Sequence, residues 1–163
     1  FFAEHGVKTL PVKMFLQGRV MPSGHLAGPI LDDHGEKSIE IGVSILDKLG
    51  ACDVGQSVIV QNGRVLAIEA AEGTSAMLAR SADLIDADAG PAVFVKMQKS
   101  GQDLRLDTPF VGAETMRAAA AVGINVLAIE SGAVMLADDL QKLADICNDH
   151  GMSFVGISAA AET

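Results

Sequence analysis

The residues best suited to chemistry lie between Lys96 and Asp107. Asp103, Arg105 and Asp107 alternate with two leucines, so an extended backbone would place the three charged side chains on one face. Aspartate is a hard oxygen ligand suited to Mg²⁺, and arginine binds phosphate oxygens through two parallel hydrogen bonds. The spacing therefore predicts a phosphate site that uses a divalent cation. A surface strand with internal ion pairs is the alternative that the spacing leaves open.

Three polar side chains lie just upstream of this alternating run: Lys96, Lys99 and Gln102. Lysine neutralises phosphate oxygens as a point charge. The upstream residues therefore extend the predicted phosphate site toward the preceding apolar strand.

A second candidate is the segment Glu69-Ala-Ala-Glu72-Gly73-Thr74, where a predicted strand passes into a predicted helix. The start of a helix offers unpaired N–H groups to an anion, and Gly73 would let a ligand approach the backbone closely. Two carboxylates beside an anion site suit a cation that bridges them to a phosphate. The competing interpretation is a solvated acidic turn before a helix that Thr74 caps.

Other polar groups carry weaker signals. Glu130 ends an apolar stretch and could line a cleft, although a turn is the simpler interpretation. No motif of the P-loop, Rossmann, serine-hydrolase or zincin type is present. The four histidines show no metal-ligand spacing: His5, His25, His34 and His150.

The elements that must position these residues alternate between strands and helices. This order predicts an α/β fold with a mixed sheet flanked by helices and at least one antiparallel hairpin. The hairpin is expected at 57–61 and 64–70, around Asn62-Gly63, a dipeptide favoured in type I′ turns. Further strands are expected at 7–12, 92–97, 124–129, 133–137 and 153–157, and helices at 36–50, 75–85, 113–122 and 139–150, the last capped by Asp138.

The bulk composition narrows the function further. The chain has 163 residues and a net charge of −9, a balance that argues against a nucleic-acid surface. Two distant cysteines without a CxxC motif predict neither a disulfide framework nor a zinc site, and reduced thiols in the cytoplasm are expected.

Glycine and proline residues between 17 and 35 predict a loop or linker, and the non-methionine start suggests that an upstream part is missing.

Three stretches together resemble a known family. They are Asp53-Val-Gly-Gln56 followed by the segment 63–74 ending in Glu-Gly-Thr, the run from Lys96 through the Arg-Leu-Asp-Thr-Pro motif to Gly112, and the apolar strand that ends at Glu130. In combination they resemble the C-terminal domain of the bacterial UDP-2,3-diacylglucosamine pyrophosphatases of the LpxI type, over about residues 36–158. Residues 97–101 replace a tract that is often proline-rich in that family, and Thr108 replaces an aliphatic residue.

The resemblance implies Mg²⁺-dependent hydrolysis of UDP-2,3-diacylglucosamine to UMP and 2,3-diacylglucosamine 1-phosphate in lipid A biosynthesis. It implies a residual N-terminal segment and interdomain linker at 1–35 and a C-terminal catalytic domain at 36–163. The expected partners are the UDP-linked acylated glucosamine, the protein's own N-terminal domain, a second copy in a homodimer, and a peripheral contact with the inner membrane. A non-catalytic module that binds a sugar phosphate or an acyl ligand is the alternative.

The same resemblance assigns roles to single residues. The family's essential aspartate corresponds to Asp107, which would bind the metal or orient the attacking water. The remaining expectations are catalytic Arg105; substrate-binding Lys96, Lys99, Gln102, Gly73, Thr74 and Glu130; and metal-binding Asp103, Glu69 and Glu72.

Overall fold

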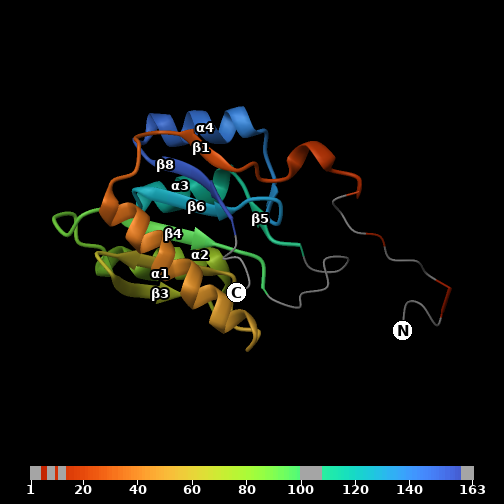
Figure 1. The fold of residues 1–163 in the computed structure, drawn as a ribbon, viewed down its shortest axis with the longest axis horizontal. Coiled ribbons are helices and arrows are strands. Elements are labelled where there is room, and N and C mark those ends of the chain that lie inside the picture. Colours follow the sequence, from red (N-terminus) through yellow and green to blue (C-terminus); the bar gives the residue numbers. More distant parts are fainter. Residues whose placement is uncertain (1–4, 7–9, 11–13, 100–107, 159–163) are drawn as a thin grey trace.

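A six-stranded mixed sheet forms the centre of the fold (Figure 1). The structure is a computed structural model that describes residues 5–6, 10, 14–99 and 108–158. In spatial order the strands are β1 (Gly24–Ala27), β8 (Ser153–Ile157), β6 (Val126–Glu130), β4 (Ala92–Lys96), β2 (Ser57–Gln61) and β3 (Arg64–Ile68). A two-stranded sheet pairs β5 (Phe110–Val111) with β7 (Met135–Leu136). The helices are η3 (Gln17–Arg19), α1 (Asp33–Gly50), α2 (Gly73–Ser81), η4 (Ala82–Leu84), α3 (Ala113–Ala121) and α4 (Leu140–Asp149).

The sheet combines parallel and antiparallel pairs. Strands β4, β6 and β8 run parallel, whereas β2 is antiparallel to both of its neighbours and β1 is antiparallel to β8. The α/β class and the mixed sheet are therefore confirmed. Because β3 and β4 are both antiparallel to β2, their carboxyl ends lie at the same edge as those of β6 and β8.

The hairpin of β2 and β3 forms around the predicted turn. Asn62 and Gly63 have φ angles of 47° and 75°, the positive values that a type I′ turn needs at both central positions. The second strand ends at Ile68, two residues earlier than expected.

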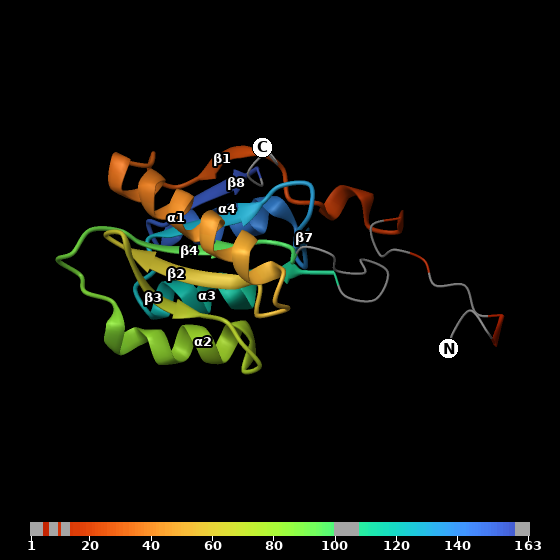
Figure 2. The same cartoon turned by 60° about the horizontal axis from the view of Figure 1, so that its bottom comes forward.

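Helices cover both faces of the sheet, and alternate residues of the strands supply two cores. On one face, α1 packs through Ile39 and Leu46 against Val58 and Val95. On the other face, a larger core joins Ile59 and Phe94 to side chains of α2, α3 and α4. Figure 2 shows α1 and α2 on opposite sides of the sheet. Burial on both faces explains why β2 and β4 are entirely buried.

Two predictions near the N-terminal part were wrong. The stretch 17–35, expected as a loop or linker, contains η3 and the edge strand β1, which pairs with β8. Helix α1 begins at Asp33 rather than at residue 36, because the Asp32 carboxylate accepts a hydrogen bond from the Gly35 N–H at 2.7 Å. The strand expected at 7–12 falls almost wholly outside the described residues.

Both predicted helix caps were also wrong. Helix α2 follows Glu72, and the Thr74 hydroxyl donates to Glu69 at 3.1 Å instead of capping the helix. Helix α4 follows Asp139, while Asp138 accepts a hydrogen bond from the Ala113 N–H at the start of α3. Strand β7 is shorter than the predicted strand at 133–137, and β5 was not predicted.

Candidate functional site at the carboxyl edge of the sheet

Several of the predicted site residues lie at or just after the carboxyl ends of strands, and these ends share one edge of the sheet. Lys96 ends β4, Glu130 ends β6, and Glu69 directly follows β3. In open α/β sheets this is the edge at which ligands usually bind. The topology therefore gathers side chains that lie far apart in the sequence.

The centre of this edge is a buried polar cluster of Lys96, Glu69, Thr74 and Ser57. The Lys96 Nζ lies 3.0 Å from the Thr74 Oγ1, 3.4 Å from the Ser57 Oγ and 4.0 Å from the Glu69 Oε2. Only 6% of the lysine side chain and 12% of the glutamate side chain are exposed. Charges so far removed from water persist only when they are paired and hydrogen-bonded. The cluster provides both the opposite charge and the hydrogen bonds.

Glu69 uses its two carboxylate oxygens differently. Its Oε1 accepts the Thr74 hydroxyl at 3.1 Å. Its Oε2 is buried and has no hydrogen-bond partner among the described residues. This oxygen is the one carboxylate atom of the cluster that could ligate a cation.

Glu130 and Lys99 flank the cluster. The Glu130 Oε2 accepts a hydrogen bond from the Gln98 N–H at 2.7 Å, which anchors the backbone just beyond β4. The Lys99 Nζ lies 2.9 Å from the Asp53 Oδ1, and this pair borders a cavity of about 480 Å³ that Gly55 and Glu69 also line. An ammonium at the rim of a cavity suits an anionic ligand.

Glu72 and Gly73 mark the start of α2. A hydrogen bond from its own backbone N–H, together with the Arg80 guanidinium at 2.8 Å, lowers the pKa of Glu72. The other carboxylate oxygen of Glu72 accepts the Ala70 N–H at 3.2 Å, so both of its oxygens are engaged. Gly73 has a φ of 79° and open space beside its Cα.

The expectations for Gln102, Asp103, Arg105 and Asp107 lie outside the described residues. Within the part of the chain that the structure describes, no three His, Cys, Asp or Glu side chains form a group able to hold a metal ion. The described residues therefore fit a metal only in part, through the Glu69 Oε2.

Sequence reasoning missed Ser57. It opens β2 and stands directly opposite Lys96 in the antiparallel register of β2 and β4. No local motif marks this serine, because its role depends on the pairing of two strands that are not joined by the hairpin. Only knowledge of the strand order could have identified it.

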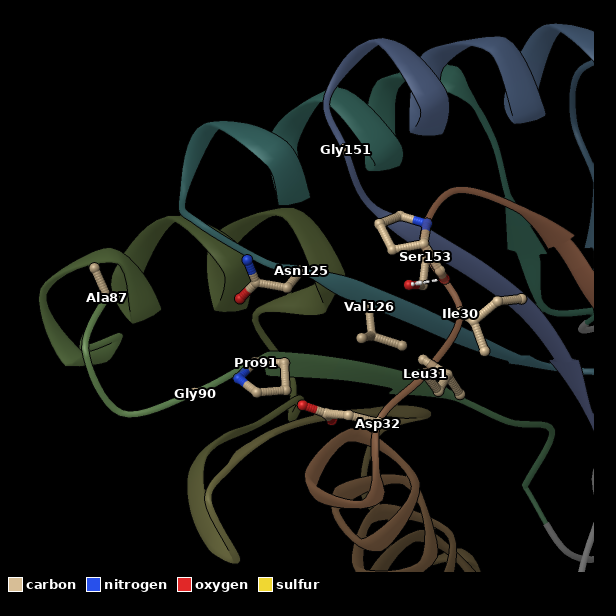
Figure 3. Close-up of a pocket in the computed structure, with 11 residues that line it drawn as sticks. Ile30, Leu31, Asp32, Ala87, Gly90, Pro91, Asn125, Val126, Gly151 and Ser153 are labelled. Atoms are coloured by element: carbon tan, nitrogen blue, oxygen red, sulfur yellow. Dashed lines mark hydrogen bonds between the residues drawn. The ribbon is translucent and has the colours of Figure 1, made fainter.

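The opposite edge of the sheet carries a second cavity, of about 310 Å³ (Figure 3). Its polar side chains are used for structure. Asn125 accepts the Ala92 N–H at 2.9 Å, Ser153 donates to the Pro29 carbonyl at 2.7 Å, and Asp32 caps α1. The cavity at the carboxyl edge is therefore the better candidate for chemistry.

Comparisons with known proteins agree with the family resemblance of the sequence. The family model described as the LpxI C-terminal domain matches residues 22–155. A curated relative, the UDP-2,3-diacylglucosamine pyrophosphatase LpxI of Caulobacter vibrioides, is 33% identical over 142 residues, which cover 84% of this chain and 50% of the relative. The chain thus spans about half the length of that relative. No helix in the described ranges has the length and apolar character needed to cross a bilayer.

Proposed function

Because this chain belongs to the LpxI C-terminal domain family, we propose that the protein carrying it is a pyrophosphatase of lipid A biosynthesis. Its substrate is UDP-2,3-diacylglucosamine, which water cleaves to UMP and 2,3-diacylglucosamine 1-phosphate. The name of the 33% identical relative supports this substrate. The observation that carries the proposal is the buried Lys96 ammonium, held by two hydroxyl groups and a carboxylate at the carboxyl edge of the sheet.

The proposed chemistry is charge stabilisation around a phosphoanhydride. Water attacks one phosphorus, and the other phosphate leaves with the electrons of the broken P–O bond. Lys96, Lys99 and Arg105 stabilise the charge that develops on the phosphate oxygens, because cations fixed in a water-poor site act more strongly than in solution. Asp107 orients the water or the metal. Gln102, Gly73, Thr74 and Glu130 contact or shape the substrate site.

Mg²⁺ is part of the proposal. Asp107 and Asp103 would hold it together with the Glu69 Oε2, and Glu72 could join them only by releasing Arg80 or the Ala70 N–H. When bound, the metal would neutralise phosphate charge and lower the pKa of a coordinated water. Carboxylates are the ligands that this hard cation prefers.

The remaining half of the protein belongs to the same proposal. We expect an N-terminal domain to complete the substrate chamber, with 1–35 as the connecting segment and 36–163 as the catalytic domain. A cytoplasmic protein in peripheral contact with the inner membrane would meet an acylated substrate there, and a homodimer is compatible with this arrangement.

UMP release by the full-length protein tests the proposal. With Mg²⁺ the wild-type protein should hydrolyse UDP-2,3-diacylglucosamine, and EDTA should stop the reaction. Asp107→Ala should lower turnover by on the order of 10²–10³-fold or more, the usual loss when a main electrostatic group is removed. The exposed Asp149→Ala on α4 is the control and should retain full activity.

Two outcomes would overturn the assignment. One is an Asp107→Ala protein with unchanged turnover. The other is a well-folded wild-type protein that binds the substrate without releasing UMP; this result would favour a non-catalytic sugar-phosphate or acyl-binding module.

A further inference from the structure

The Thr74 hydroxyl stands between two opposite charges. Its Oγ1 lies 3.0 Å from the Lys96 Nζ and 3.1 Å from the Glu69 Oε1. A hydroxyl has one hydrogen to donate and two lone pairs to accept. Since the ionised carboxylate can only accept and the ammonium can only donate, the proton of Thr74 points to Glu69 and a lone pair receives an N–H of Lys96. The Thr74 hydroxyl thus links the Lys96 ammonium to the Glu69 carboxylate, whose direct contact with each other is only 4.0 Å.

The backbone around this link is fixed by three neighbouring strands. Ser57 is paired with Lys96 in the β2–β4 register, and its carbonyl accepts the Glu69 N–H at 2.9 Å. The Ser57 hydroxyl gives the ammonium a second acceptor at 3.4 Å. A long lysine side chain normally samples many rotamers. Here the acceptors are held by β2 and α2, so the ammonium position is set by the fold.

We propose that Thr74, assisted by Ser57 and oriented by Glu69, is a positioning residue for the Lys96 ammonium. It holds this ammonium at the carboxyl edge of the sheet, where it meets a phosphate oxygen of the substrate. This inference rests on the proposed function. It gives the Thr74 side chain a role distinct from the substrate contact expected from the sequence. It also gives Glu69 a task that does not require a metal.

Steady-state kinetics of the full-length protein test the positioning role. Thr74→Val keeps the shape of the side chain but removes the hydroxyl, whereas Thr74→Ser keeps the hydroxyl. Thr74→Val should lower kcat by about 10²-fold with a smaller change in KM, because a displacement of about 1 Å in a charged group has an effect of this size. Thr74→Ser should stay within a few-fold of wild type. The exposed neighbour Ser75→Ala on the same helix is the matched control and should be unchanged.

A measurement without substrate reports the reactivity of the Lys96 amino group. Limiting acetic anhydride acetylates lysines in competition, and peptide mass spectrometry compares Lys96 with the exposed Lys37 of α1. Loss of the hydroxyl should raise the relative acetylation of Lys96 several-fold in Thr74→Val and leave it unchanged in Thr74→Ser. Equal acetylation of Lys96 in the two variants would overturn the inference.

The two readouts separate this inference from the proposed function. An active wild-type protein whose Thr74→Val variant keeps its kcat would refute the positioning role and leave the pyrophosphatase standing. An inactive wild-type protein with the expected change in acetylation would refute the pyrophosphatase and support the hold of Thr74 on Lys96.

Discussion

At the scale of single residues, burial decides how strongly a pair of opposite charges affects the stability of the fold. The Lys96–Glu69 pair is almost fully enclosed, so removal of one partner would leave a buried charge without compensation. The Arg80–Glu72 and Lys142–Asp138 pairs are partly exposed, and such pairs contribute little through attraction alone. Asp138 matters for another reason, namely its hydrogen bond to a backbone N–H.

Asp138→Ala should destabilise the fold in a pH-dependent way. The hydrogen bond from the Ala113 N–H, followed by the Lys142 ammonium, holds the pKa of Asp138 below its ordinary value. A group whose pKa is lowered in the folded state stabilises that state above its unfolded pKa and loses this effect as the pH falls through the folded pKa. The urea midpoint of the variant should therefore lie below that of wild type at pH 7. The difference between the two midpoints should shrink as the pH falls below about 4.

Urea unfolding at a series of pH values checks this expectation. The exposed Asp83→Ala serves as the control and should follow the wild-type curve. A difference between Asp138→Ala and wild type that stays constant or grows on acidification would contradict the assigned role.

At the scale of elements, α1 lies close to the sheet because a glycine faces it. Gly42 is buried in the middle of the helix, on the same side as Ile39 and Leu46. A Cβ at this position would lie 2.5 Å from the Val95 Cγ2 and 3.3 Å from the Val58 Cγ1. The small residue therefore sets the distance between α1 and the strand that carries Lys96.

Gly42→Ala should lower the free energy of unfolding despite its better helix propensity. The alanine gains about 1 kcal/mol in the helix, but overpacking of a buried contact costs about 1–3 kcal/mol. A net loss of about 1 kcal/mol is expected in urea denaturation. Lys37→Ala, on the exposed side of the same helix, should change stability little. A Gly42→Ala protein more stable than wild type would contradict this expectation, because it would show that α1 can move slightly away from the sheet without strain.

At the scale of the whole molecule, helices on both faces enclose the sheet and bury its two cores. Cys147 of α4 lies in the larger core, with its Sγ 3.7 Å from the Met116 Sδ. Burial raises the pKa of the Cys147 thiol to about 12. Cys52 is exposed near the end of α1. The two thiols therefore report on different parts of the same protein.

Thiol labelling should distinguish these two cysteines. Because the thiolate is the reactive form, iodoacetamide at pH 8 should modify Cys52 quickly in the native protein and Cys147 only when the domain unfolds. Peptide mass spectrometry follows each site, and Cys52→Ser is the control that removes the fast reaction. Comparable native rates at the two sites would show that the core opens locally.

Local sequence information was sufficient for elements whose signals come from near neighbours. The Asn62-Gly63 turn follows from the φ values that those residues tolerate, and α4 follows from the helical spacing of Leu143 and Cys147. The apolar runs that became β4 and β6 were identified in the same way, although β6 is shifted relative to its predicted range. The polar residues of the site could also be chosen by type and spacing.

Two of the errors arise where a residue interacts with a distant partner. Strand β1 was missed because its pairing with β8, more than a hundred residues later, outweighs its glycine-rich composition. Asp138 was assigned to the helix that follows it, whereas tertiary packing brings the start of α3 within its reach.

The sequence by itself determined the α/β class, the hairpin and the candidate polar residues, since these depend on propensities and spacing within short windows. Only the tertiary structure decided that Ser57, Glu69 and Thr74 meet around Lys96, because this meeting requires the order and register of β3, β2 and β4. Strand pairing depends on the stability of the entire fold, and no short window of sequence contains that information.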